Sequence, residues 1–78
     1  MFYEITYIMS FRLKDQVILE IENKALEISK VCYRYEAIYV SNPIMINGKY
    51  FLEVKILYGL YNTPKKYIFI VQENDLKD

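Results

Sequence analysis

The chain has 78 residues and no net charge, with ten basic and ten acidic side chains. This length is near the lower limit for a self-sufficient hydrophobic core, so we expect one domain over residues 1–78. A dedicated nucleic-acid-binding protein usually has a basic excess, because neutralising phosphates supplies much of its affinity, and zero net charge weighs against that class.

Residue types that commonly carry chemistry are scarce. Histidine is absent and Cys32 is the single cysteine. Nucleophilic sites that need histidine, an internal disulfide and a cysteine-based zinc site are therefore excluded. We expect a cytoplasmic protein that is not an enzyme, with no metal, no cofactor and no small-molecule substrate. No apolar run approaches the ~18 residues needed to cross a bilayer, and the start of the chain, with Glu4 and no basic segment, does not resemble a signal peptide.

The first half of the chain predicts a strand and then a helix. Residues 2–10 alternate as a strand does, with every second side chain apolar on one face. The period changes near Lys14, and a helix is expected over about 14–32. Its apolar stripe comprises Val17, Ile18, Ile21, Ala25, Ile28 and Cys32. Leu19 and Leu26 fall on the opposite face.

The second half predicts a hairpin and one further strand. Residues 35–46 and 49–58 flank Asn47-Gly48, a pair typical of a two-residue type I′ turn. An uninterrupted ladder from this turn would pair Ile38 with Leu57 and Val40 with Lys55. Pro43 has no N–H to donate, so it indicates a bulge or an edge position. A strand over 66–72 follows, and we expect the polar tail, 73–78, to fray.

These elements predict an α+β fold in the order β-α-β-β-β. One helix packs on a four-stranded, mostly antiparallel sheet, which makes a two-layer sandwich. Sequential adjacency favours the sheet order 1-2-3-4, whereas Pro43 on an edge would favour 2-3-4-1.

The sheet face away from the helix is expected to carry eight apolar residues that no second helix can cover. They are Phe2, Ile8, Ile38, Val40, Phe51, Leu57, Ile68 and Ile70. A patch of that size would exceed the largest on most monomers and approach a standard interface. We therefore expect a protein-interaction module whose partner is a second copy packed sheet on sheet or another protein. Pairing of exposed strand edges is a competing mode of assembly.

A nucleic-acid-binding surface is the alternative function. Lys65 and Lys66 lie next to Tyr61 in the sequence, and aromatic side chains flanked by basic residues can stack single-stranded bases. A pair of lysines in a turn is more often a solvated loop. The many Ile, Tyr and Lys residues suit A/T-rich codons, which fits an inhibitor or adaptor encoded by a phage, virus or plasmid.

Overall fold

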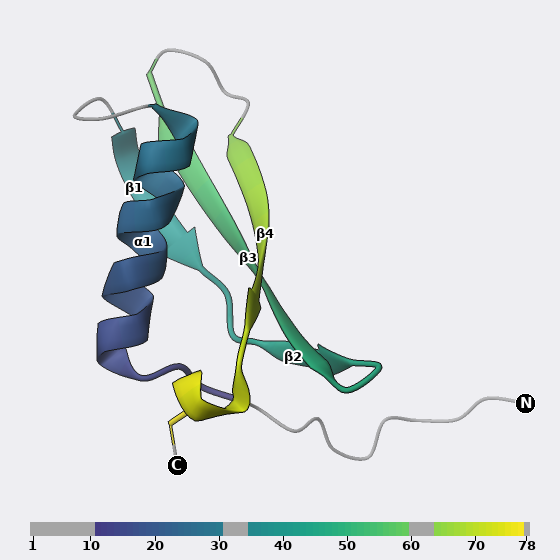
Figure 1. The fold of residues 1–78 in the computed structure, drawn as a ribbon. Coiled ribbons are helices and arrows are strands. Elements are labelled where there is room, and N and C mark those ends of the chain that lie inside the picture. Colours follow the sequence, from purple (N-terminus) through teal and green to yellow (C-terminus); the bar gives the residue numbers. More distant parts are fainter. Residues whose placement is uncertain (1–10, 31–34, 60–63, 78) are drawn as a thin grey trace, which may run out of the picture.

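The computed structural model describes residues 11–30, 35–59 and 64–77. Within these ranges the helix comes first and the strands follow it (Figure 1). The elements are α1 (Asp15–Ser29), β1 (Tyr35–Val40), β2 (Ile44–Ile46), β3 (Lys49–Tyr58), β4 (Lys65–Val71) and a short 3-10 helix (Glu73–Asp75). No helix in the described part of the chain is long and apolar enough to cross a membrane.

The predicted fold class is confirmed: one helix packs on a four-stranded antiparallel sheet. The central strand is β3, with β4 on one side and both β1 and β2 on the other. Within the described residues the sheet is therefore three strands wide, and its four strands are not the four that were expected. The predicted strand over 35–46 is divided into β1 and β2, and the predicted strand over 2–10 lies outside the described residues.

Helix α1 begins at Asp15, whose carboxylate suits the positive end of the helix dipole. It ends when Lys30 takes the left-handed conformation, with φ of 58°, and donates its N–H to the Leu26 carbonyl. The helix is thus shorter than the predicted span. Leu19 is 60% exposed, as expected, but Leu26 packs against the core, whereas Ile28 is 47% exposed.

The register of the β2–β3 hairpin follows the prediction close to the turn. Asn47 and Gly48 both have positive φ, and Ile44 lies opposite Phe51. On β1, however, Val40 lies opposite Val54 rather than Lys55. Three residues, 41–43, therefore span two residues of β3, which is the bulge that Pro43 indicates.

This bulge reverses the expected faces of β1. Because side chains alternate with a period of two, a shift by one residue moves every side chain of the strand to the other face. Ile38 and Val40, expected on the outer face, instead pack against the core beneath α1, and Tyr39 is 53% exposed. The sequence-based assignment of these side chains to faces is therefore wrong for β1.

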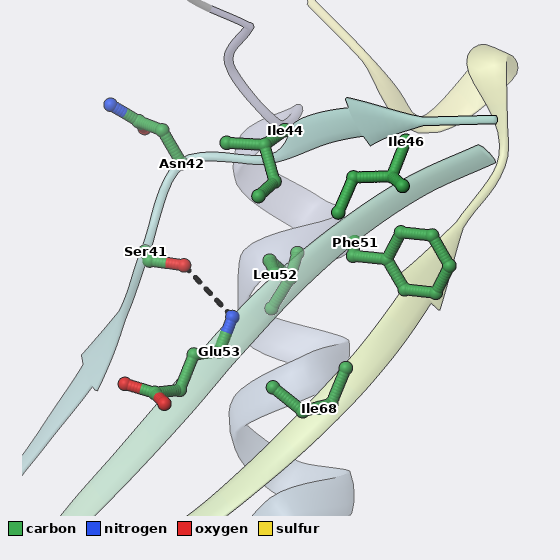
Figure 2. Close-up of a pocket in the computed structure, with 8 residues that line it drawn as sticks. All are labelled: Ser41, Asn42, Ile44, Ile46, Phe51, Leu52, Glu53 and Ile68. Atoms are coloured by element: carbon green, nitrogen blue, oxygen red, sulfur yellow. Dashed lines mark hydrogen bonds between the residues drawn. The ribbon is translucent and has the colours of Figure 1, made fainter. Parts of the chain in front are cut away.

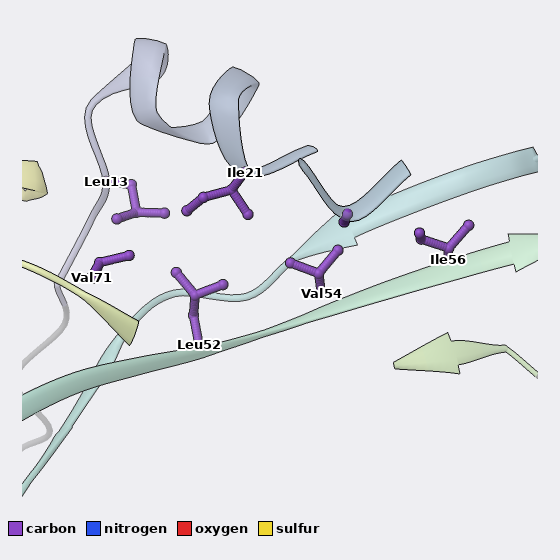
Figure 3. Close-up of a cluster of buried hydrophobic side chains, with 7 residues drawn as sticks. Leu13, Ile21, Leu52, Val54, Ile56 and Val71 are labelled. Atoms are coloured by element: carbon purple, nitrogen blue, oxygen red, sulfur yellow. The ribbon is translucent and has the colours of Figure 1, made fainter. Parts of the chain in front are cut away.

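The core lies between α1 and the sheet (Figure 3). Its buried apolar members are Leu13, Ile21, Ala25, Leu52, Val54, Ile56 and Val71. Most of these alternate along β3 or recur along one side of α1, so the helix covers one face of the central strand. We call the opposite side of the sheet the outer face.

The C-terminal residues form ordered structure where the sequence predicts fraying. Asp75 closes a capping box with Gln72, and its backbone carbonyl accepts a hydrogen bond from the Lys14 N–H at 2.9 Å. Leu76 forms an isolated bridge with Leu13 and packs against the core. The segment therefore holds the chain that leads into α1.

Candidate protein-binding face

Residues on the outer face form rows that run across β3 and the strands on either side of it. One row passes through Phe51 on β3, because Ile44 on β2 and Ile70 on β4 both lie opposite it. On the side toward the hairpin turn, Ile46 lies opposite Lys49. The register thus places an apolar row directly beside a charged residue.

The next rows, away from the turn, are more polar. Glu53 lies opposite Ile68, and its backbone exchanges hydrogen bonds with Ser41 on the other side. Beyond it, Lys55 lies between Tyr39 and Lys66, with its Nζ 5.8 Å from the centre of the Tyr39 ring.

The apolar patch of this face consists of Ile44, Ile46, Phe51, Ile68 and Ile70. Its isoleucines are 54%, 49%, 65% and 56% exposed, respectively, while Phe51 is half-buried. A contiguous group of exposed large aliphatic side chains with polar neighbours can mark a site of protein–protein contact. Burying a complete isoleucine side chain is worth about 1.5–3 kcal/mol, so covering this patch would release a substantial part of that for each residue.

A shallow cavity opens within the patch, at the bulge (Figure 2). Its volume is about 570 Å³, and its lining comprises Ser41, Asn42, Ile44, Ile46, Phe51, Leu52, Glu53 and Ile68. The cavity lies where the edge strand departs from β3, with the aliphatic side chains on its walls and the Glu53 carboxylate at one side. Its chemistry suits an apolar side chain better than a charged ligand.

The structure retains part of the predicted interface. Phe51, Ile68 and Ile70 lie on the outer face together, and Leu57 lies on the same face, half-buried and three rows from Phe51. Phe2 and Ile8 lie outside the described residues.

The prediction missed Ile44 and Ile46, which replace Ile38 and Val40 on this face. Their alternation with Met45 and their pairing across the Asn47-Gly48 turn contained the signal. Four roughly half-exposed isoleucines and the half-buried Phe51 give a patch of ~300–600 Å², the size of the largest patch on an ordinary monomer and smaller than the sequence predicts.

The two described residues of the nucleic-acid alternative, Lys65 and Lys66, lie on opposite faces of the sheet. Lys65 lies on the helix side, where its Nζ donates a hydrogen bond to the Ser29 carbonyl at 2.9 Å and lies 5.3 Å from the centre of the Tyr58 ring. Lys66 points to the outer face opposite Lys55, and Tyr61 lies outside the described residues. The side chains of these two neighbouring lysines therefore lie on different faces of the sheet.

Within the described residues, no cluster of three or more acidic, cysteine or histidine side chains could hold a metal ion. The outer face carries an apolar patch with charged side chains beside it. Comparisons with models of protein families, with curated proteins and with solved structures found no match for this chain.

Proposed function

We propose that this protein is a non-enzymatic interaction module that binds protein through the outer face of its sheet, and that a second copy of the chain is its partner. The exposed row Ile44–Phe51–Ile70 supports the proposal most strongly. It places aliphatic and aromatic side chains in a line across all three strands, at the centre of the apolar patch.

The size of the patch fits the apolar core of a small interface. A standard interface buries about 800 Å² on each partner, more than the patch alone supplies. The remainder would come from the surrounding polar and charged residues, such as Lys49, Glu53 and Ser41. An apolar centre within a polar rim is the usual anatomy of a protein interface.

The patch is also suited to packing against another sheet. Two sheets pack face to face about 10 Å apart, with the side chains of the two inner faces interdigitated. A second copy supplies a sheet of the same width and the same apolar row. A two-fold axis then closes the assembly at two subunits.

The test uses two matched substitutions in light scattering after size exclusion, over a dilution series. Ile70→Lys introduces a charge into the centre of the patch, and Leu19→Lys introduces one on α1, away from the sheet. Both wild-type side chains are more than half exposed, at 56% and 60%, so neither change should unfold the chain.

We expect the wild-type chain and Leu19→Lys to be dimers at high concentration and Ile70→Lys to be a monomer. A dimer that survives Ile70→Lys would assign assembly to a strand edge. A wild-type chain that stays monomeric throughout would contradict self-association and leave the face for a different protein.

Nucleic-acid binding stays the second candidate, supported by the row Tyr39, Lys55 and Lys66. An exposed tyrosine and two lysines on one sheet face could stack and neutralise a single strand. Fluorescence anisotropy of a labelled oligonucleotide would measure this. Binding through this row would weaken steeply as salt increases and would be lost in Lys66→Glu.

A further inference from the structure

The charges beside the apolar row are arranged symmetrically about Phe51. Lys49 and Glu53 precede and follow Phe51 by two residues on β3, so all three side chains lie on the outer face. At about 3.4 Å per residue, each charged residue lies roughly 7 Å along the strand from Phe51, in opposite directions. A positive and a negative group thus flank the centre of the patch at equal spacing.

This pattern is complementary to itself under one kind of two-fold rotation. An axis that runs between two facing sheets, perpendicular to the strands and through the Phe51 row, reverses the direction along the strand. It places each Glu53 opposite the partner's Lys49, twice in the dimer. The row Ile44–Phe51–Ile70 then meets the same row of the second copy.

Other placements of the axis fit the charges less well. An axis parallel to β3 would place Glu53 against the partner's Glu53 and Lys49 against the partner's Lys49. Like charges facing each other across an interface disfavour that arrangement. An axis through the Val54 position would pair Glu53 with the partner's Lys55, but it would also place Ile68 against the partner's Lys66.

We propose that two copies pack by their outer faces about a two-fold axis through the Phe51 row, with each Glu53 paired to the partner's Lys49. This inference rests on the proposed function and specifies the geometry of its interface. Facing sheets cross at about 30°, which displaces residues two positions from the axis by only ~3–4 Å. That displacement is within the range of a lysine side chain.

The cavity at the bulge has an occupant in the same arrangement. Ile46 lies two residues from Ile44 on the side of Lys49, and the cavity opens beside Ser41 on the side of Glu53. Rotation about the Phe51 row therefore brings Ile46 of each copy over the partner's cavity. Ile44, Ile46 and Phe51 also line this cavity, so the partner's isoleucine would lie among apolar side chains.

The test exchanges the charges. Lys49→Glu and Glu53→Lys are prepared separately, and the folding of each is checked by circular dichroism. Each substitution alone places like charges in contact at both pairs and should weaken the dimer at least about tenfold. An equimolar mixture, with one chain ¹⁵N-labelled, should form heterodimers as tightly as the wild type, because every pair is then opposite in sign.

Lys55→Glu is the matched control, since it changes the charge on the same strand and face without a charged counterpart in the proposed packing. It should leave the dimer unchanged. Native mass spectrometry separates heterodimers from homodimers in the mixture through the isotope label.

Three results would overturn the inference: a monomeric wild type, a dimer unaffected by Lys49→Glu, or a dimer that Lys55→Glu weakens as much. A dimer that Lys55→Glu weakens and Lys49→Glu does not would favour the axis through the Val54 position. If Ile70→Lys abolishes the dimer while the charge variants do not affect it, the proposed function holds and only this geometry fails.

Discussion

Ser41 and Glu53 are joined by two hydrogen bonds at the point where β1 leaves the register of the hairpin. The Ser41 N–H donates to the Glu53 carbonyl at 2.9 Å, and the Glu53 N–H donates to the Ser41 Oγ at 2.8 Å. The serine side chain thus supplies the acceptor that the displaced backbone no longer offers. This pair satisfies the central strand across the bulge.

Replacing Ser41 with alanine should lower the free energy of unfolding by about 1 kcal/mol, because the Glu53 N–H loses its acceptor. Urea unfolding followed by circular dichroism measures the change as a lower midpoint at constant slope. Ser41→Thr retains the hydroxyl and is the control. Equal stability of Ser41→Ala and the wild type would show that water replaces the serine without cost.

The assignment of faces on β1 can be tested with two adjacent residues. Ile38→Lys places a charge against the core and should cost about 2–3 kcal/mol. Tyr39→Lys changes an exposed outer residue and should cost less, about 1 kcal/mol, because it removes the contact of the ring with Lys55 and places a like charge opposite it. An uninterrupted hairpin ladder predicts the opposite order, so urea unfolding of the two variants decides between the registers.

Lys65 fastens the end of α1 to β4 through its hydrogen bond to the Ser29 carbonyl. Lys65→Met keeps the length of the apolar stem but removes the donor, and a loss of about 1 kcal/mol is expected. Lys66→Met, at the neighbouring outer position opposite Lys55, should be neutral or slightly stabilising because it removes a like-charge pair. Thermal unfolding measures the stability of both variants. A larger loss of stability in Lys66→Met than in Lys65→Met would refute this role of Lys65.

Substitutions at Gly48 and Asn47 test how the backbone conformation of the turn contributes to stability. The φ of Gly48 is 79°, and a Cβ added there would meet no atom within 4 Å. Gly48→Ala should therefore cost about 1 kcal/mol through backbone strain alone, without any steric clash. Asn47→Gly, at the other turn position with positive φ, should be close to neutral. A larger loss in Asn47→Gly would indicate that the asparagine side chain stabilises the turn.

The sequence predicts the parts of this fold that depend on local signals. Asn47-Gly48 gives the turn type and the register of Ile44 with Phe51, because such a turn fixes the pairing of its nearest neighbours. Helical periodicity locates α1, and Ile21 and Ala25 are buried as expected. These features require only a few consecutive residues to interpret.

The parts that failed depend on contacts between distant residues. Pro43 indicates a bulge, but the local sequence does not tell how many residues the bulge contains. One extra residue reverses the faces on which Ile38 and Tyr39 lie. The polar composition of 73–78 conceals Leu76, whose contact with Leu13 involves residues far apart in the chain. The bulge also explains why the predicted site differs from the observed one. Ile44 and Ile46 lie on the outer face where Ile38 and Val40 were expected.

Isotope-filtered nuclear Overhauser spectroscopy measures directly which residues of two copies meet in the dimer. A sample is prepared from equal amounts of ¹³C-labelled and unlabelled chain. The proposed packing predicts contacts from the Phe51 ring of one copy to the Ile44 and Ile70 methyl groups of the other. A dimer whose intermolecular contacts arise only from residues along the edge of β4 that faces away from β3, with none to Phe51, would contradict the account.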